Sequence, residues 1–193
     1  MRRQDFIPQV IKKFGYSSYL EIGCGNNEMF KEVHLPDKIG VDPASGGTLR
    51  TTSDVFFSIN TRKFDVIFID GLHQCDQALK DIENALRVLN KNGVIFVHDC
   101  NPPQEVNQVI PPVHGAKWNG DTWKAFALIR KRKDVDSIVG DFEHGFGVIK
   151  IRENQAPIEF EKNSVSELVY SDLEENRKSW FGLLNADEIL DWM

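Results

Sequence analysis

The chain has 193 residues, enough for one domain with a full hydrophobic core and a short appendage. Its formal net charge of −6 argues against non-specific binding to nucleic acid or to an anionic membrane, because both need a basic surface. No stretch approaches the ~18 apolar residues of a membrane span, and three cysteines without a secretory signal indicate reduced thiols in the cytoplasm.

Residues 5–14 are expected to form a helix, because apolar side chains recur on one face. Four apolar runs, each ending in an acid or a glycine, cover 19–23, 38–42, 64–70 and 93–99. Runs without polar alternation are typical of parallel strands covered on both faces. Between the last two such runs, apolar residues at helical spacing from Ala78 to Leu89 predict a right-handed strand–helix–strand unit.

Two further features complete the predicted sheet. A helical pattern covers 122–134, and two apolar runs around a turn predict a closing hairpin over 137–142 and 145–151. Together the elements predict an α/β fold: a Rossmann-like, doubly wound and mostly parallel sheet over residues 1–151, with the N-terminal helix in 1–16.

The remaining residues, 152–193, differ in texture. They are charged, carry no strand-like run and show two helical patterns, at about 163–178 and 186–192, which predict a helical C-terminal extension. Its many apolar side chains must be buried, either on the same domain or against a second copy of the chain. A homo-oligomer formed through this extension is therefore one expectation.

In a doubly wound sheet, ligands bind outside the carboxyl ends of the strands. The first strand runs into E-I-G-C-G-N-N, where Gly23 and Gly25 permit a tight turn close to a ligand. A dinucleotide-binding loop would have its third glycine at position 28, but Glu28 stands there and is a poor neighbour for phosphate. Asp42 ends the second strand, where a carboxylate can accept both hydroxyls of a ribose. The alternative is a plain strand–helix turn.

Two later strand ends each carry an acid and a histidine, in F-I-D-G-L-H and F-V-H-D-C-N-P-P. Asp70 and Asp99 end adjacent parallel strands, so their carboxylates are expected to lie close together beside a cofactor. Paired carboxylates with a nearby amide oxygen, such as that of Asn101, suit a hard cation such as Mg²⁺. Because an imidazole side chain titrates near neutral pH, His73 is a candidate general base.

Other interpretations of these strand ends stay open. Asp70 could cap the following helix, and His98 could be a core histidine with its hydrogen bonds satisfied. Two H-x-C pairs, His73 with Cys75 and His98 with Cys100, could also form a tetrahedral zinc site. A one-residue gap on a strand, however, points the two side chains to opposite faces.

The ordered motifs YLEIGCGNN, IGVDP, SDVFF, FDVIFIDGLH and NGVIFVHDCNP resemble those of class I S-adenosylmethionine-dependent methyltransferases over about residues 17–151. They are most similar to the branch of metal-dependent sugar and small-molecule O-methyltransferases. The resemblance implies a seven-stranded sheet whose last strand is antiparallel. It also implies that S-adenosylmethionine contacts the following residues: Glu21, Gly23 and Gly25 at the methionine part, Asp42 at the ribose, Ser53 and Asp54 near the adenine, and Asp70.

The same resemblance implies roles at the other two strand ends. In the resembling enzymes, the acids ending the fourth and fifth strands bind Mg²⁺, and the histidine of the D-G-x-H motif is the proposed base. Asp70, Asp99 and His73 match these positions. Some relatives carry an acid just before the second of these ligands, where this chain has His98, and Asn101 is then expected to supply the missing oxygen.

A long, proline-rich segment, 101–124, follows the predicted fifth strand and can arch over the site. Trp118, Asp121 and Trp123 are its candidate acceptor-binding residues, since indole rings stack on sugars or aromatic rings and carboxylates bond hydroxyls. The alternative is that both tryptophans anchor the loop to the core.

These observations predict a cytoplasmic methyltransferase that O-methylates a small polyhydroxylated acceptor, for example a sugar, without nucleic acid or membrane as partner. S-adenosylmethionine is its expected cofactor, and Mg²⁺ is a second candidate. One alternative is an NAD(P)-dependent Rossmann oxidoreductase. Another is a non-catalytic cofactor-binding module that acts through its C-terminal extension.

Overall fold

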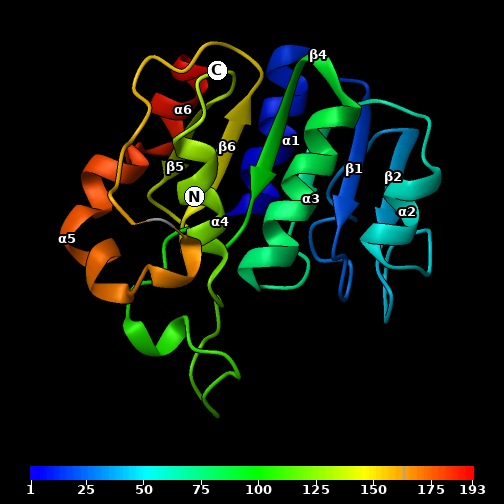
Figure 1. Ribbon diagram of the computed structural model, residues 1–193. Coiled ribbons are helices and arrows are strands. Elements are labelled where there is room, and N and C mark those ends of the chain that lie inside the picture. The colour runs from blue at the N-terminus through cyan, green and yellow to red at the C-terminus, as the bar shows by residue number, and fades with distance from the viewer. Residues whose placement is uncertain (163) are drawn as a thin grey trace.

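The computed structural model describes residues 1–162 and 164–193, and its centre is a six-stranded sheet in the order β2-β1-β3-β4-β6-β5 (Figure 1). β1 pairs in parallel with β2 and β3, and β3 with β4, whereas β6 is antiparallel to both β4 and β5. The predicted antiparallel last strand is therefore confirmed. The strands are β1 (Ser18–Ile22), β2 (Asp37–Val41), β3 (Phe64–Ile69), β4 (Leu89–Val97), β5 (Asp136–Gly140) and β6 (Phe146–Lys150).

Helices cover both faces of the sheet, which explains why its strands are apolar without alternation. Apolar side chains of α1 (Arg3–Phe14) and α6 (Ala186–Trp192) pack on one face. The opposite face is covered by α2 (Ser53–Ile59), α3 (Cys75–Val88), α4 (Thr122–Arg130) and α5 (Tyr170–Phe181) (Figure 1). Two 3-10 turns, Glu105–Asn107 and Val165–Glu167, lie in the connections. This two-sided cover confirms the doubly wound α/β class.

The expected seventh strand is reduced to a single bridge. Leu49 pairs in parallel with Val41 at the edge of the sheet, but no strand forms around it among the described residues. The connection from Val41 to Leu49 is short, and a parallel crossover needs a dozen or more residues. The expectation of seven strands is therefore wrong by one edge strand.

The C-terminal extension packs on its own domain. Leu168, Leu173, Trp180 and Phe181 join the core cluster of the sheet face that carries α3 and α4. Ile189 of α6 joins the cluster on the opposite face. Residue 163, where the predicted helix begins, lies outside the described residues, and α5 starts only at Tyr170. None of the described helices is long and apolar enough to span a bilayer.

Gly23 fixes how closely the loops after β1 and β3 approach. Its φ is +84°, and an added Cβ would lie 2.1 Å from the backbone oxygen of Asp70. Gly15 also has positive φ, +67°, but an added Cβ there would meet nothing within 4 Å. The two glycines therefore share a conformational cost on substitution and differ in the steric contact.

Replacing Gly23 by alanine should lower the free energy of unfolding by about 3 kcal/mol or more, since left-handed backbone and overpacking both contribute. The matched variant Gly15→Ala should lose only about 1 kcal/mol, from the backbone term alone. Urea unfolding of both variants measures the difference. Equal losses would show that the Gly23–Asp70 approach is not sterically demanding.

Candidate active site

A cavity of about 660 Å³ opens at the carboxyl ends of β1, β2 and β3. Its wall combines the loops that follow these strands with the first turns of α1 and α2 and the first two turns of α3. Every residue predicted to contact a cofactor lines it, although the seven come from four separate segments of the chain. These residues are Glu21, Gly23, Gly25, Asp42, Ser53, Asp54 and Asp70.

Asp42 closes the loop after β1 against the loop after β2. Its Oδ2 accepts a hydrogen bond from the backbone nitrogen of Gly25 at 2.9 Å, and its Oδ1 accepts from those of Ala44 and Ser45 at 2.8 Å each. Burial alone would raise the pKa of Asp42, but these backbone donors lower it. An ionised carboxylate with lone pairs to spare therefore faces the cavity, as ribose binding requires.

In the cavity wall, Gln77 of α3 donates hydrogen bonds to three side chains. Its Nε2 donates to Ser53 Oγ at 3.3 Å, Asp54 Oδ1 at 3.2 Å and Asp81 Oδ1 at 3.0 Å. Asp81 is buried, and burial raises its pKa. Gln77 and Asp81 were not predicted, although their spacing of four residues on a helix that follows a site strand is a signal that could have identified them.

Glu21 is a buried acid in the cavity wall. Its carboxylate accepts a hydrogen bond from Tyr19 Oη at 2.5 Å. Burial raises the pKa of Glu21 to about 7. The group therefore changes charge near neutral pH and favours a cationic neighbour when it is ionised.

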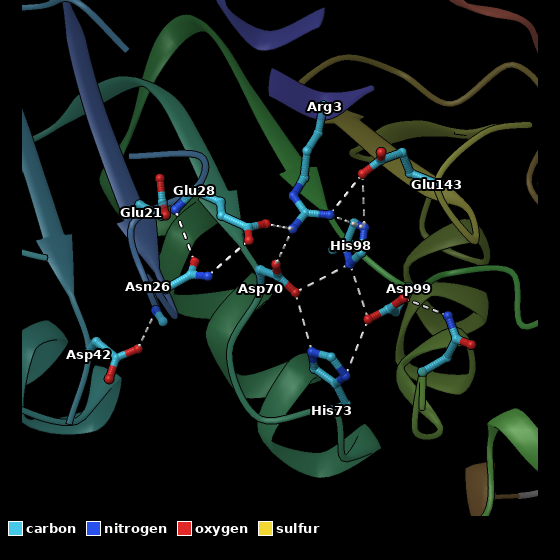
Figure 2. Close-up of polar contacts among 12 residues, drawn as sticks. Arg3, Glu21, Asn26, Glu28, Asp42, Asp70, His73, His98, Asp99 and Glu143 are labelled. Atoms are coloured by element: carbon cyan, nitrogen blue, oxygen red, sulfur yellow. Dashed lines mark hydrogen bonds and ion pairs between the residues drawn. The ribbon is translucent and has the colours of Figure 1, made fainter. Parts of the chain in front are cut away.

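A second group of polar side chains lies beside the cavity, where β3 and β4 end (Figure 2). His73 Nε2 lies 3.2 Å from Asp70 Oδ1, and His73 Nδ1 lies 3.2 Å from Asp99 Oδ2. His98 Nδ1 lies 3.3 Å from Asp70 Oδ1 and 3.1 Å from Asp99 Oδ2. We call Asp70, His73, His98 and Asp99 the acid–histidine cluster. The two acids end adjacent strands and do converge, as their positions in the sequence predict.

The electrostatics of the cluster are dominated by carboxylates. Burial would lower the pKa of His98, but Asp70, Asp99 and Glu143 raise it to about 11. Burial would likewise lower the pKa of His73, but the hydrogen bond with Asp70 and the charge of Asp99 raise it. In turn, the positive charge of His98 and the hydrogen bond from His73 hold the pKa of Asp70 well below its usual range despite burial.

Arg3 and Glu143 contact the acid–histidine cluster, although both belong to segments that are far away in the sequence. Arg3 Nη1 donates to Glu143 Oε2 at 2.8 Å and lies 3.0 Å from His98 Nε2 (Figure 2). Hydrogen bonding to His98 and Arg3 lowers the pKa of Glu143 to about 2. Neither residue was predicted, and only the position of Glu143 in the turn of the closing hairpin gives any signal.

The segment after β4 lies over His73, but the contacts of its predicted acceptor-binding residues differ from the expected ones. Trp118 stacks on the His73 ring with centroids 5.2 Å apart, and its Nε1 donates to Val109 O. Trp123 is completely buried in α4 and donates to Gln108, so the expectation that it contacts an acceptor does not hold. Asp121 Oδ1 accepts from Cys75 N at 2.6 Å and thus caps α3, a structural role.

Asn101 also departs from its predicted role. Its side-chain oxygen, the atom that would bind a metal, accepts a hydrogen bond from Arg177 of α5. Asn119 of the following loop approaches the acids instead, and its Nδ2 donates to Asp99 Oδ1 at 2.5 Å. Asn101 is therefore not available as a metal ligand in this conformation. Asn119 is an additional site residue that was not predicted from the sequence.

The metal-ligating atoms of the cluster are close together. One ligand atom from each of Asp70, His73 and Asp99 lies within 4.8 Å of the others. Among the described residues, neither Cys75 nor Cys100 belongs to this group, so the alternative of two H-x-C pairs around zinc is not supported.

Comparison with known proteins agrees with this geometry. A family model described as a methyltransferase domain matches residues 31–100, a segment that includes Asp42, Asp70, His73 and Asp99. The chain has the class I methyltransferase fold. The fold class that the sequence motifs imply is therefore confirmed. A search of curated proteins finds no match.

Three solved structures illustrate the shared methyltransferase fold. The S-adenosylhomocysteine-bound methyltransferase PaMTH1 of Podospora anserina is 13% identical, covers 78% of each chain and has a TM-score of 0.56. An O-methyltransferase of Bacillus cereus in complex with S-adenosylhomocysteine is 17% identical, with 76% of this chain and 78% of that chain covered and a TM-score of 0.54. TomG of Streptomyces achromogenes, an O-methyltransferase of tomaymycin synthesis in complex with S-adenosylmethionine, is 15% identical, with 78% and 79% covered and a TM-score of 0.51.

Proposed function

We propose that this protein is an S-adenosylmethionine-dependent O-methyltransferase acting on a small polyhydroxylated acceptor, for example a sugar. One observation carries the proposal: Asp70 and His73 line the cavity and also belong to the acid–histidine cluster. A donor in the cavity and a base for the acceptor are thereby neighbours. The methyltransferase match and the neighbouring structures with bound S-adenosylmethionine or S-adenosylhomocysteine support the same choice.

The cavity wall offers side chains for each part of this cofactor. Glu21, Gly23 and Gly25 surround the space for the methionine part, and Asp42 offers its ionised carboxylate to the ribose hydroxyls. Ser53 and Asp54 also line the cavity and are the proposed neighbours of the adenine. Glu28 follows the two glycines and lines the cavity. Its negative charge would repel a phosphate, which disfavours a dinucleotide in the same space.

His73 is the proposed general base. An alcohol is a poor nucleophile until it loses its proton, and a positioned imidazole can accept that proton as the methyl group is transferred. Trp118 stacks on the ring, and Asp70 and Asp99 contact its two nitrogens, so its orientation is fixed from three sides. The proton would pass from the acceptor hydroxyl to a ring nitrogen of His73.

The cluster also fits a divalent cation. His73 Nδ1 is buried without a hydrogen-bond partner among the described residues, yet it lies 3.2 Å from Asp99 Oδ2. Asp70 and Asp99 would hold the ion through carboxylate oxygens. Such an ion lowers the pKa of an acceptor hydroxyl and orients it. Because imidazole nitrogens are close by, Mn²⁺ and Zn²⁺ should be compared with Mg²⁺.

The proposed function is tested by turnover. The purified protein is incubated with S-adenosylmethionine and a panel of sugars, catechols and other hydroxylated small molecules, and release of S-adenosylhomocysteine is followed. We expect release that depends on one acceptor class and a product heavier by one methyl group at oxygen. Methylation at nitrogen or carbon would contradict the O-methyltransferase proposal. NAD⁺ reduction by the same panel would favour the oxidoreductase alternative.

Cofactor affinity should depend on pH through Glu21. The cofactor's α-ammonium group prefers the ionised form of a carboxyl whose pKa is about 7, so affinity for S-adenosylhomocysteine should rise from pH 5.5 to pH 8 and then level off. Well below this pKa the rise approaches about tenfold per pH unit. Isothermal titration calorimetry across this range measures it.

Glu21→Gln should flatten that profile, whereas Glu32→Gln, at an exposed acid, should keep it. A wild-type profile that is already flat would show that Glu21 does not face the ammonium group.

A further inference from the structure

Arg3 is an unusual component of the cavity wall. It occupies the first turn of α1, and its side chain is only 18% exposed because it reaches inward between Glu28 and Glu143 (Figure 2). The guanidinium lines the cavity and also touches the acid–histidine cluster. Arg3 thus joins the proposed cofactor space to the proposed site of chemistry.

Only one edge of this guanidinium is satisfied. Nη1 donates to Glu143 and lies against His98 Nε2. Nε is buried and has no hydrogen-bond partner among the described residues. To the residues that the structure describes, Nη2 makes only long ion-pair contacts, 3.8 Å to Asp70 Oδ2 and 4.0 Å to Glu28 Oε2. A buried donor without a hydrogen-bond partner costs free energy, so a ligand that supplied an acceptor at this edge would be stabilised.

The open edge has a defined chemistry. The Nε and Nη2 hydrogens of arginine are parallel donors whose spacing matches the two oxygens of a carboxylate. Neither Asp70 nor Glu28 comes close enough to use both donors. A carboxylate of a ligand in the cavity could accept from both at once.

The charges on the cavity wall point to the same ligand group. Arg3 is the one lysine or arginine among the lining residues that the structure describes, whereas acids are numerous. S-adenosylmethionine carries a sulfonium, an α-ammonium and a single carboxylate. The acids suit its two cationic groups, and Arg3 is the one lysine or arginine of the described wall that could pair with its carboxylate. The acids of the wall are Glu21, Glu28, Asp42, Asp54, Asp70 and Asp81.

We propose that Arg3 binds the α-carboxylate of the cofactor's methionine part through Nε and Nη2. This inference rests on the proposed function and extends it, because it gives the N-terminal helix a part in cofactor selection. Through Nη1 the same guanidinium holds Glu143 and His98. Arg3 is therefore a binding residue for the cofactor and a positioning residue for the cluster.

The test compares two ligands that differ only in the carboxylate: S-adenosylhomocysteine and its decarboxylated analogue. Calorimetry on the wild-type protein should show at least tenfold tighter binding of S-adenosylhomocysteine. In Arg3→Met this ligand should bind 10- to 100-fold more weakly, while the decarboxylated analogue should bind as before. Arg2→Met is the matched control, since Arg2 is exposed and paired with Asp5, and it should change neither affinity.

Several outcomes would overturn the inference. Equally weakened binding of both ligands in Arg3→Met would mean that Arg3 only supports the shape of the site. Unchanged affinity for both ligands would show that Arg3 does not contact the carboxylate. If Arg3→Met does not fold, Arg3→Lys takes its place, because lysine keeps the charge but lacks the two-donor edge. Full retention of the ligand preference in Arg3→Lys would reject the paired contact. A wild-type protein that binds neither ligand would instead reject the proposed function.

Discussion

Replacing His73 by alanine should lower kcat by 10²- to 10⁴-fold, the usual contribution of a general base, while affinity for S-adenosylhomocysteine stays unchanged. Binding should survive because the cavity wall is formed mainly by the loops after β1 and β2. Release of S-adenosylhomocysteine with the acceptor found in the panel measures kcat, and calorimetry measures affinity. His34→Ala, at an exposed histidine outside the site, is the control and should keep full activity.

Two results would separate a base from a merely structural histidine. Added imidazole should restore part of the activity of His73→Ala, because a small base can occupy the vacated space. An equal fall in activity and cofactor affinity, without rescue, would mean that His73 maintains the cavity. Unchanged turnover would remove it from the mechanism altogether.

Replacing Asp99 by asparagine should lower turnover about 10²-fold or more, because the cluster would lose a carboxylate that the proposed cation needs. The substitution keeps the size of the side chain and an oxygen to accept from Asn119. The backbone should tolerate it as well, since Asp99 has a φ of +61° and asparagine adopts this left-handed conformation readily. The loss therefore reports on charge.

The wild-type protein should lose activity in excess EDTA and regain it with a divalent cation, whereas Asp99→Asn should stay low under both conditions. Asp76→Asn, at an exposed acid of α3, should behave as wild type. Full wild-type activity in excess EDTA would show that turnover needs no divalent cation. Asp99 would then act only as the partner of the two histidines.

The convergence of Asp42, Asp70, His73 and Asp99 could be predicted because it depends on simple geometry. Parallel strands place their carboxyl ends at one edge of the sheet, and short apolar runs with glycines and acids at their ends locate those edges in the sequence. The order of the strands then makes Asp70 and Asp99 neighbours.

The contributions of Arg3, Glu143 and Asn119 could not be predicted, because they depend on how separate segments dock. Arg3 reaches His98 and Glu143 across 95 and 140 positions of sequence. Asn119 belongs to an irregular segment, whose path is fixed in part where an added Cβ on Gly120 would lie 1.7 Å from His73 O. No periodic pattern marks such contacts.

Asn101 shows how a local detail redirects a side chain. The backbone nitrogens of Cys100 and Asn101 donate to Gly145 O and His144 O, so the chain after β4 pairs with the hairpin turn. This pairing turns the Asn101 side chain toward Arg177 rather than toward Asp99. The turn itself requires positive φ from Glu143 to Gly145, a conformation that the sequence suggests only through the glycine.

In the proposed function, one cavity holds the methyl donor beside His73. Calorimetric titration of the wild-type protein with S-adenosylhomocysteine and, separately, with NAD⁺ tests it most directly. We expect one molecule of S-adenosylhomocysteine to bind per chain, Asp42→Ala to weaken that binding, and NAD⁺ to give no heat. Binding of NAD⁺ without binding of S-adenosylhomocysteine would contradict the account.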